Sequence, residues 1–361
     1  MLRPVIAGHA GCAQYEDTIA AYVFSATLAI QDITGSEHSG VSSSHVLKRL
    51  EGSNESRSYL FALTRNCLPR PLGQLGYPEI APEDLLEVEA WVFVSLPLLE
   101  DLSVIEAHIT LDALHAPMPG QEVPAEPWQA ALELVDALST TLNRPVRHVW
   151  VTLSAGAPAP IALAASGYHH AYAETQAEFG ISHFEQSCDV VENFAFSPQD
   201  LESVIEVLRT SSANYPRGSL LIDTIDWTEK RFHEASTRLI DRGGTQLSAL
   251  SRNAEGRVVG MAEIVHFDAD ADNLCELGLV YVLPEHRGQG HATAMIYSAL
   301  AAAKEKWPKV NTCFLSYPAD DAAATAIAQA LGAQTLSLTA AWQKTSGLGP
   351  AVDSCPGRHF R

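Results

Sequence analysis

The sequence has few cysteines, and none of them are arranged in pairs. Its six cysteines are widely scattered, and no two show the C-x-x-C spacing of zinc sites and redox motifs. Disulfide frameworks belong to short secreted chains that are dense in cysteine, which this chain is not. We therefore expect free thiols, a reducing cytoplasmic location and no bound metal. The cysteines are Cys12, Cys67, Cys188, Cys275, Cys313 and Cys355.

Basic residues are also scarce. The chain has 23 Lys and Arg against 43 Asp and Glu, which gives a formal net charge of −20 at pH 7. Nucleic acids and anionic membranes attract clustered Lys and Arg, so neither is expected as a partner. The acidity favours a cationic acceptor such as an amine, although acidity is also an ordinary means of keeping a protein soluble.

Long apolar runs are absent as well. The early run from Ala20 to Ile30 is too short to cross a bilayer. It follows Glu16 and Asp17 instead of the basic residues that begin a signal peptide. We interpret it as a core helix and expect no association with a membrane.

The length of 361 residues, 47% of them apolar, favours two domains over one. The C-terminal half alternates helices and strands, and Ser197-Pro198 has the serine N-cap and first-turn proline that begin a helix. Its predicted helices and strands indicate an α/β unit. In chain order, they are a strand 190–196, helices 198–212 and 227–240, strands 246–252, 257–267 and 274–283, a helix 289–306, a strand 311–317, a helix 320–331 and a strand 334–342.

The N-terminal half repeats this order more faintly. Glu106 and Glu276 occupy matching points 170 residues apart, and Gly120 and Gly290 have the same separation. Internal duplication is the economical interpretation. The corresponding ranges are helices 14–30 and 44–50, strands 58–64, 88–96 and 104–114, a helix 127–142, a strand 147–153, a helix 158–165 and a strand 168–176.

The most informative segment is Val280–Ile296, where a β-branched strand gives way to a glycine-rich turn and an alanine-rich helix. A helix N-terminus has unpaired N–H groups and partial positive charge, and Gly288 and Gly290 let an anion approach the backbone. A P-loop would end in Gly-Lys-Ser/Thr, and a Rossmann turn would need a third glycine near Thr293. Neither is present, so the turn predicts a different kind of phosphate site.

The string Arg287-Gly288-Gln289-Gly290-His291-Ala292 fits the Arg/Gln-x-x-Gly-x-Gly/Ala signature of the GNAT acetyltransferases. The C-terminal half, about 170 residues, also resembles this superfamily in the order of its elements. The resemblance implies a tandem GNAT protein of the α/β (α+β) class, with two mixed, mostly antiparallel sheets flanked by helices. It implies a degenerate domain at 1–180, a GNAT domain at 188–345 and a tail at 346–361.

The resemblance also implies that the turn holds the pyrophosphate of acetyl-CoA, the acyl donor. The degenerate half has Pro117 and Pro119 where the turn has Arg287 and Gln289, and proline has no N–H to donate. We therefore expect one acetyl-CoA per chain. The residues implied to contact it are Val280, Tyr281, Val282, Arg287, Gly288, Gln289, Gly290, His291, Ala292 and Asp321.

Acetyl transfer to an amine needs a base for the amine proton. Glu276 resembles the catalytic glutamate of the histone-acetylating branch in its place on the strand before the turn, and Glu263 on the preceding strand is the second candidate. The tyrosine that many family members carry on the last helix falls on Ala328 here, so Tyr317 is the substitute candidate for the general acid.

Two functions remain open at the level of sequence. The first is an acetyl-CoA-dependent N-acetyltransferase acting on a small-molecule or peptide amine, as a monomer or homodimer. The second is a catalytically silent tandem GNAT protein that senses acetyl-CoA. Tyr215–Gly218 lies where GNAT folds line the acceptor site, and Arg217 there is a candidate for reading an acceptor carboxylate.

Overall fold

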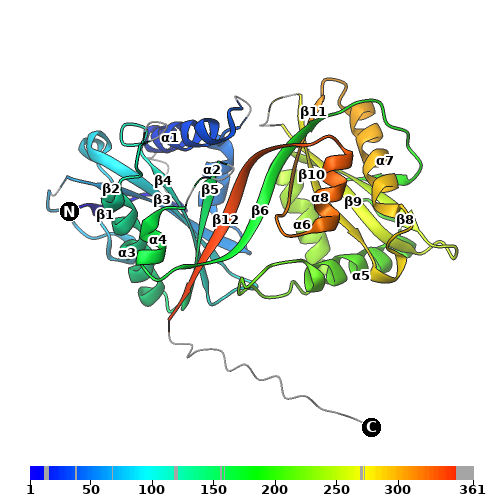
Figure 1. Cartoon of the computed structure of the whole chain (residues 1–361). Helices are drawn as coiled ribbons and strands as arrows, with labels where there is room; N and C mark the ends of the chain where they lie inside the picture. Colours follow the sequence, from blue (N-terminus) through cyan, green and yellow to red (C-terminus); the bar gives the residue numbers. More distant parts are fainter. Residues whose placement is uncertain are drawn as a thin grey trace, which may run out of the picture.

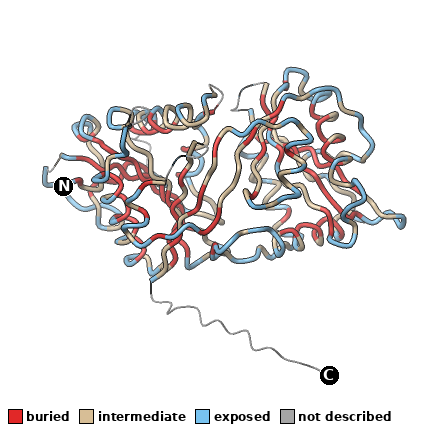
Figure 2. The backbone as a smooth tube through the Cα atoms, in the orientation of Figure 1, coloured by how far each residue is buried: buried red, intermediate tan, exposed pale blue. Residues whose placement is uncertain are grey.

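One continuous sheet runs through the whole molecule (Figure 1). The computed structural model describes residues 1–11, 16–36, 39–66, 68–117, 121–154, 157, 159–268, 271 and 273–346. Its 12 strands follow the order β1-β2-β3-β4-β5-β12-β6-β11-β10-β9-β8-β7. Helices cover both faces, and buried backbone runs along the sheet through both halves (Figure 2).

The N-terminal half places α1 and α2 on one face of the sheet and α3 and α4 on the other. Apolar side chains that alternate along its strands supply a separate core for each face. Its elements are β1 (Arg3–His9), α1 (Glu16–Thr34), α2 (Ser43–Glu51), β2 (Ser56–Thr64), η1 (Gln74–Gly76), η2 (Pro82–Glu87), β3 (Val88–Pro97), β4 (Val104–Leu111), α3 (Ala125–Thr141), β5 (Val146–Leu153), α4 (Ile161–Ala165) and β6 (His169–Gly180).

The C-terminal half repeats the arrangement, with α5 and α6 on one face and α7 and α8 on the other. Ser197 caps α5 by accepting a hydrogen bond from the Asp200 N–H, and Pro198 is the first helical residue, as predicted. Its elements are β7 (Asp189–Glu192), α5 (Pro198–Asn214), α6 (Glu229–Asp241), β8 (Gly244–Arg252), β9 (Val258–Phe267), β10 (Leu274–Val282), η3 (Pro284–His286), α7 (His291–Lys306), β11 (Thr312–Pro318), α8 (Ala322–Ala330) and β12 (Gln334–Thr345).

We name the two faces of the sheet by these helices. The α5 face is covered by α1, α2, α5 and α6, and the α7 face by α3, α4, α7 and α8. Cross-strand partners point to the same face, so the register places each side chain on one of them.

The two halves exchange their last strands. β12, at the end of the C-terminal half, lies between β5 and β6 of the N-terminal half. β6, at the end of the N-terminal half, pairs in turn with β11 of the C-terminal half, over Thr312–Pro318. Neither half therefore completes its sheet without a strand from the other.

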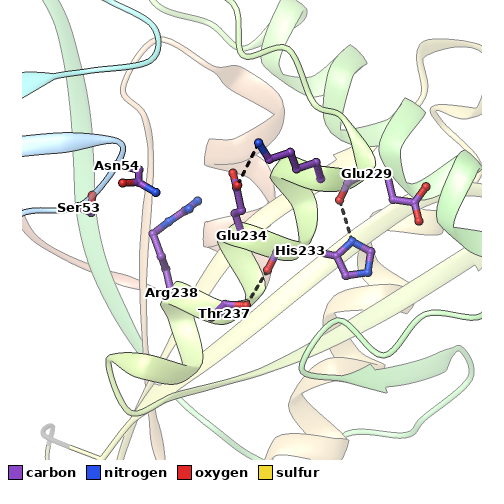
Figure 3. Close-up of a pocket in the computed structure, with 8 residues that line it drawn as sticks. Ser53, Asn54, Glu229, His233, Glu234, Thr237 and Arg238 are labelled. Carbon is purple, nitrogen blue, oxygen red and sulfur yellow. Dashed lines mark hydrogen bonds and ion pairs between the residues drawn. The ribbon is translucent and has the colours of Figure 1, made fainter.

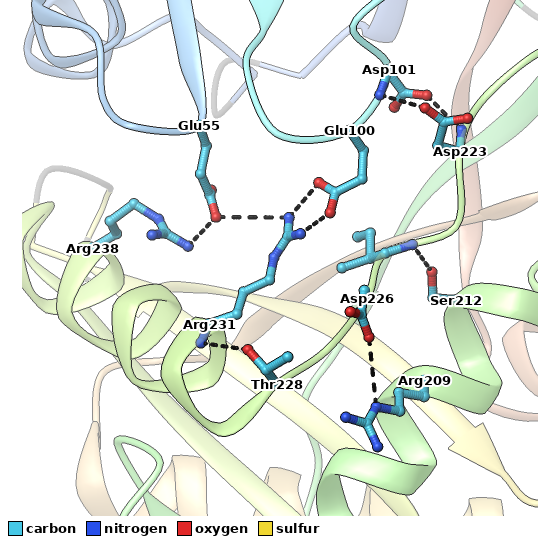
Figure 4. A network of polar contacts seen from close by, with 11 residues as sticks. Glu55, Glu100, Asp101, Arg209, Ser212, Asp223, Asp226, Thr228, Arg231 and Arg238 are labelled. Atoms are coloured by element: carbon cyan, nitrogen blue, oxygen red, sulfur yellow. Dashed lines mark hydrogen bonds and ion pairs between the residues drawn. The ribbon is translucent and has the colours of Figure 1, made fainter.

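Helix α6 also joins the halves (Figure 4). Arg231 on α6 forms a bidentate ion pair with Glu100, and Arg238 pairs with Glu55. The side chains of Arg231, Glu100 and Arg238 are each at most 21% exposed. Solvent therefore screens these ion pairs less than it would at an open surface. Helix α6 is thus held against the N-terminal half.

The predicted fold class is confirmed, with a mostly antiparallel sheet flanked by helices, but the two predicted sheets form one continuous sheet because β6 and β12 pair across the halves. The sequence missed β1, and it extended β7 through Asn193 and Phe194, which adopt positive φ and end the strand. No helix in the described part of the chain is long and apolar enough to span a membrane. The same residues contain no group of His, Cys, Asp and Glu side chains arranged to hold a metal ion.

Candidate functional site

The glycine-rich turn joins β10 to α7 at the edge of the C-terminal core. Gly288 and Gly290 have φ of 75° and 80°, a left-handed conformation that glycine adopts without strain. A β-carbon built on either residue would meet no other atom within 4 Å. The backbone of this turn is therefore open to an approaching group.

The turn also presents unpaired donors. Among the described residues, no protein group accepts a hydrogen bond from the backbone N–H groups of residues 288–293. They lie at the N-terminus of α7, a 16-residue helix whose dipole adds partial positive charge. Arg287 stands beside them, since its Nε donates to the Val282 carbonyl at 3.0 Å and its guanidinium lies 5.2 Å from the Tyr281 ring centroid. Together these groups can hold a phosphate.

The strand that leads into the turn separates from its parallel neighbour. β10 pairs with β11 only over Leu274–Leu277, although it continues to Val282. A bulge interrupts its pairing with β9 between Leu277 and Val280. Alternate backbone groups of an antiparallel strand point away from the partner, so those of β10 beyond Leu277 face the gap toward β11.

Glu263 on β9 lies beside this bulge. Its Oε2 would be 3.7 Å from a β-carbon built on Gly278, so the missing side chain leaves room for the carboxylate. Packed protein surrounds the carboxyl group, and this desolvation raises its pKa to about 7. Hydrogen bonds from the Gln246 side chain, at 3.0 Å, and from the Leu279 N–H lower the pKa by less.

Glu276 occupies the same α5 face two residues before the bulge. It is exposed, and it pairs with Val265 on β9 and Phe314 on β11, where the strands are still joined. The structure therefore brings Glu263 and Glu276 to the same face of adjacent strands, with Glu263 level with the part of β10 that no longer pairs with β11.

The other predicted residues lie around the gap. Tyr317 lies on β11 two residues after Leu315, the last residue that pairs with β10, and it packs against the core of the α7 face. Asp321 caps α8, because its Oδ1 accepts from the N–H groups of Ala323 and Ala324. His291, in the first turn of α7, pairs through Nδ1 with the Ser251 hydroxyl at 2.6 Å.

The remaining predicted contacts divide between the turn and the strand. Gln289 is exposed between the two glycines, and Ala292 is partly buried in the first turn of α7. Val280 and Val282 belong to the core of the α7 face, whereas Tyr281 packs on the α5 face. Arg217 differs from the expectation, since its guanidinium donates to the carbonyls of Ile222 and Ala213 and thus holds its own loop.

In the N-terminal half, two parallel strands also separate, but the helix that follows begins later than its counterpart α7. β4 pairs with β5 only over Val104–His108, and α1 packs against both strands and against β12. α3 begins at Ala125, four residues later than the 170-residue offset from α7 would place it. Pro117 is partly exposed before it, while Pro119 and Gly120 lie outside the described residues.

A separate groove of about 850 Å³ lies between α6 and the loop after α2 (Figure 3). Its walls are polar and carry both charges; Lys230 and Glu234, for example, approach to 3.7 Å. None of the residues predicted from the sequence line it. The lining residues are Ser53, Asn54, Glu229, Lys230, His233, Glu234, Thr237 and Arg238.

Comparison with known proteins gives a family match within the C-terminal half and structural matches to the whole fold. Residues 212–333 match the family model described as the acetyltransferase (GNAT) family. A tandem GNAT protein from the clavulanic acid biosynthesis pathway superimposes with a TM-score of 0.64 at 15% identity, over 97% of this chain and 100% of that one.

Two further solved structures are similar in fold. A GCN5-related N-acetyltransferase from Sphaerobacter thermophilus gives a TM-score of 0.56 at 14% identity, over 91% of each chain. A glucosamine N-acetyltransferase region of a fungal β-N-acetylglucosaminidase gives 0.53 at 9% identity, over 95% of this chain and 38% of that one. No curated protein matches the chain in sequence.

Proposed function

We propose that this chain, which belongs to the GNAT superfamily as a tandem GNAT protein, transfers an acetyl group from acetyl-CoA to a primary amine. The reaction is assigned to residues 188–345, and residues 1–180 are assigned a supporting role without acetyl-CoA. Acetyl-CoA is the donor substrate, with the turn of residues 287–292 as the site of its pyrophosphate.

One observation carries the proposal. The open, donor-rich turn lies at the end of β10, whose backbone faces a gap, so a phosphate site and an extended hydrogen-bonding edge are continuous. An elongated thioester with an anionic end needs both features. Val280, Tyr281 and Val282 would contribute backbone groups, while Arg287 and His291 would lie near the phosphates.

Glu263 is our preferred general base. A carboxyl group with a pKa of about 7 is partly ionised at neutral pH and still basic enough to take a proton from an ammonium group. The neutral amine then attacks the thioester carbonyl, the C–N bond forms and the C–S bond breaks. The second amine proton leaves with the thiol. Glu276, the sequence's first candidate, remains the alternative base at the same face.

The general acid is proposed as Tyr317 or water. Ala328 is buried on α8 where many family members have a tyrosine, so that helix offers no acid at this point. This same observation favours the second candidate function, an acetyl-CoA sensor without catalysis, because the turn could bind while no residue protonates the thiolate.

Thiol release and calorimetry test the proposal together. We expect acetyl-CoA to bind once per chain and to release its thiol only when an acceptor amine from a panel of small amines, aminoglycosides and peptides is added. Binding without thiol release for any amine would favour the sensor. Two equivalent acetyl-CoA sites would contradict the assignment of the N-terminal half.

A further inference from the structure

The exchanged strand β6 brings carboxylates of the N-terminal half to the C-terminal site. Its register with β11 pairs Gln176 with Ser316 and Glu174 with Pro318. Ser316 directly follows Leu315, the last β11 residue that pairs with β10. On the α5 face of β6, Gln176 and Glu174 therefore lie beside the part of β11 that no longer pairs with β10, across the gap from Glu263.

Glu174 is held by three hydroxyl groups from three elements. Ser316 on β11 donates to its Oε2 at 2.8 Å, and Tyr172 on β6 donates to its Oε1 at 3.0 Å. Tyr215, at the end of α5, donates to the same Oε1 at 3.5 Å. Gln176 completes the arrangement by donating to the Ser316 hydroxyl at 3.0 Å. These bonds fix the direction of the carboxylate before any ligand arrives.

Glu178 lies four residues after Glu174, on the same strand and face. Its partner in register is Phe314, which pairs on its other side with Glu276. The Oε2 atom of Glu178 is buried and has no hydrogen-bond partner among the described residues. A buried carboxylate oxygen without a partner is costly, so this atom is expected to gain a donor when the site is filled.

In the described part of the chain, no ion pair neutralises these two groups. Among the described residues, no Lys, Arg or His forms an ion pair with Glu174 or Glu178. Arg217, two residues after Tyr215, is committed to the carbonyls of its own loop. The charge on this wall of the site is thus available to a ligand.

We propose that the carboxylates of Glu174 and Glu178 attract the ammonium groups of the acceptor that do not react, so that the preferred acceptor is a diamine or polyamine rather than a monoamine. This inference rests on the proposed function. One amine would react beside Glu263 on β9, and the other would lie against β6. Three strand spacings separate these strands, about 14 Å across the sheet. A long, flexible dication can span that distance.

The role also explains why the N-terminal half is retained at the site. A carboxylate on β6 can recognise an acceptor only while β6 is paired with β11, so the strand exchange makes specificity depend on both halves. Phe314, between Glu178 and Glu276, adds an aromatic surface against which an alkyl chain or an ammonium group can pack.

The test compares matched acceptors with matched variants. Initial rates of thiol release are measured with 1,8-diaminooctane, spermidine and octylamine for the full chain and for Glu174→Gln and Glu178→Gln. Glu202→Gln is the control, because it removes the same charge from an exposed position on α5. Glutamine keeps the shape of glutamate and one of its two acceptor oxygens, so the fold should be preserved, and the melting temperature checks this.

We expect the parent protein to have at least a tenfold lower KM for 1,8-diaminooctane and spermidine than for octylamine. Glu174→Gln and Glu178→Gln should each raise the diamine KM about tenfold while kcat and the KM for acetyl-CoA change less than twofold, and Glu202→Gln should change nothing. A diamine preference that added salt weakens is expected as well.

Two results would overturn the inference while leaving the proposed function intact: equal KM values for octylamine and 1,8-diaminooctane, or an unchanged diamine KM in both β6 variants. If none of the three amines supports thiol release, calorimetry with spermidine tests whether the cation site exists. Spermidine binding that Glu174→Gln abolishes would support the cation site without catalysis, and absence of binding would overturn it.

Discussion

The carboxylate of Glu263 lies over Gly278, with Oε2 3.7 Å from the position of a β-carbon on that glycine. The two residues belong to neighbouring strands, and the bulge in β10 widens the space between them. Because Gly278 has no side chain, the carboxylate can remain close to the backbone where β10 and β11 part. This placement, with its raised pKa, makes Glu263 the first residue to test.

The rate of acetyl transfer should follow the ionisation of Glu263. The pKa of about 7 means that kcat/KM rises with pH to a plateau above about pH 8 in the parent protein. Glu263→Gln should lower kcat by roughly 10²-fold and remove this rise. Glu276→Gln is the matched variant, on the same face. If Glu276→Gln rather than Glu263→Gln removed the rise, Glu276 would be the base.

The same carboxyl group should affect stability. Its pKa is raised from 4.5 to about 7 on folding, so the folded state holds the proton more tightly than the unfolded state does. The parent should therefore lose stability relative to Glu263→Gln as the pH rises from about 4.5 to 7, with no further loss above that. Urea unfolding at several pH values measures this difference. A difference that did not change with pH would mean that Glu263 ionises normally.

The glycine turn should bind acetyl-CoA through its open backbone. Gly288→Ala and Gly290→Ala add a β-carbon where a phosphate approaches, and we expect each to weaken acetyl-CoA binding at least tenfold in calorimetry. Gly256→Ala is the control, because Gly256 has a similar φ of 82° and equally open surroundings in another turn. All three should lose about 1 kcal/mol of stability to backbone strain. Equal losses of affinity in the three variants would contradict the assigned site.

The ion pairs between α6 and the N-terminal half should stabilise the whole chain. Arg231→Met removes a partly buried bidentate contact with Glu100 and should lower the free energy of unfolding by about 1–3 kcal/mol. Lys230→Met, at a neighbouring residue whose side chain is 85% exposed, should change it by less than about 0.5 kcal/mol. Urea titrations compare the two, and similar effects would mean that the Arg231 contact contributes little.

A fragment that begins at Ser187 should not fold on its own. It lacks β6, so β11 loses a strand along its full length, and β12 loses both of its neighbours. The exposed edges and apolar surface should cause aggregation, which size-exclusion chromatography detects. Joint expression with residues 1–186 should restore a soluble complex. A stable, active monomer from the fragment alone would mean that the strand exchange is dispensable.

Much of the fold can be predicted from local sequence patterns. The helix at Pro198 and the strand–turn–helix around Gly290 appear where the sequence predicts them, within a few residues. The strand β1 escaped prediction because Arg3–His9 contains Pro4 and Gly8, which weaken a strand pattern. The pairing of β6 and β12 also escaped prediction, since their apolar alternation fits either half.

By itself the sequence determined which residues form the anion-binding turn. Glycines that can adopt positive φ, the start of a helix with its unpaired N–H groups, and the absence of proline from residues 287–292 are all properties of adjacent residues. The tertiary structure alone decided that Glu263 is desolvated and that Glu174 reaches the C-terminal site. Both depend on groups distant in the chain: the pKa of Glu263 on the atoms packed around it, and the place of Glu174 on a strand exchanged between the halves. Hydration and strand pairing are set by neighbours in space, and no local pattern of residues encodes them.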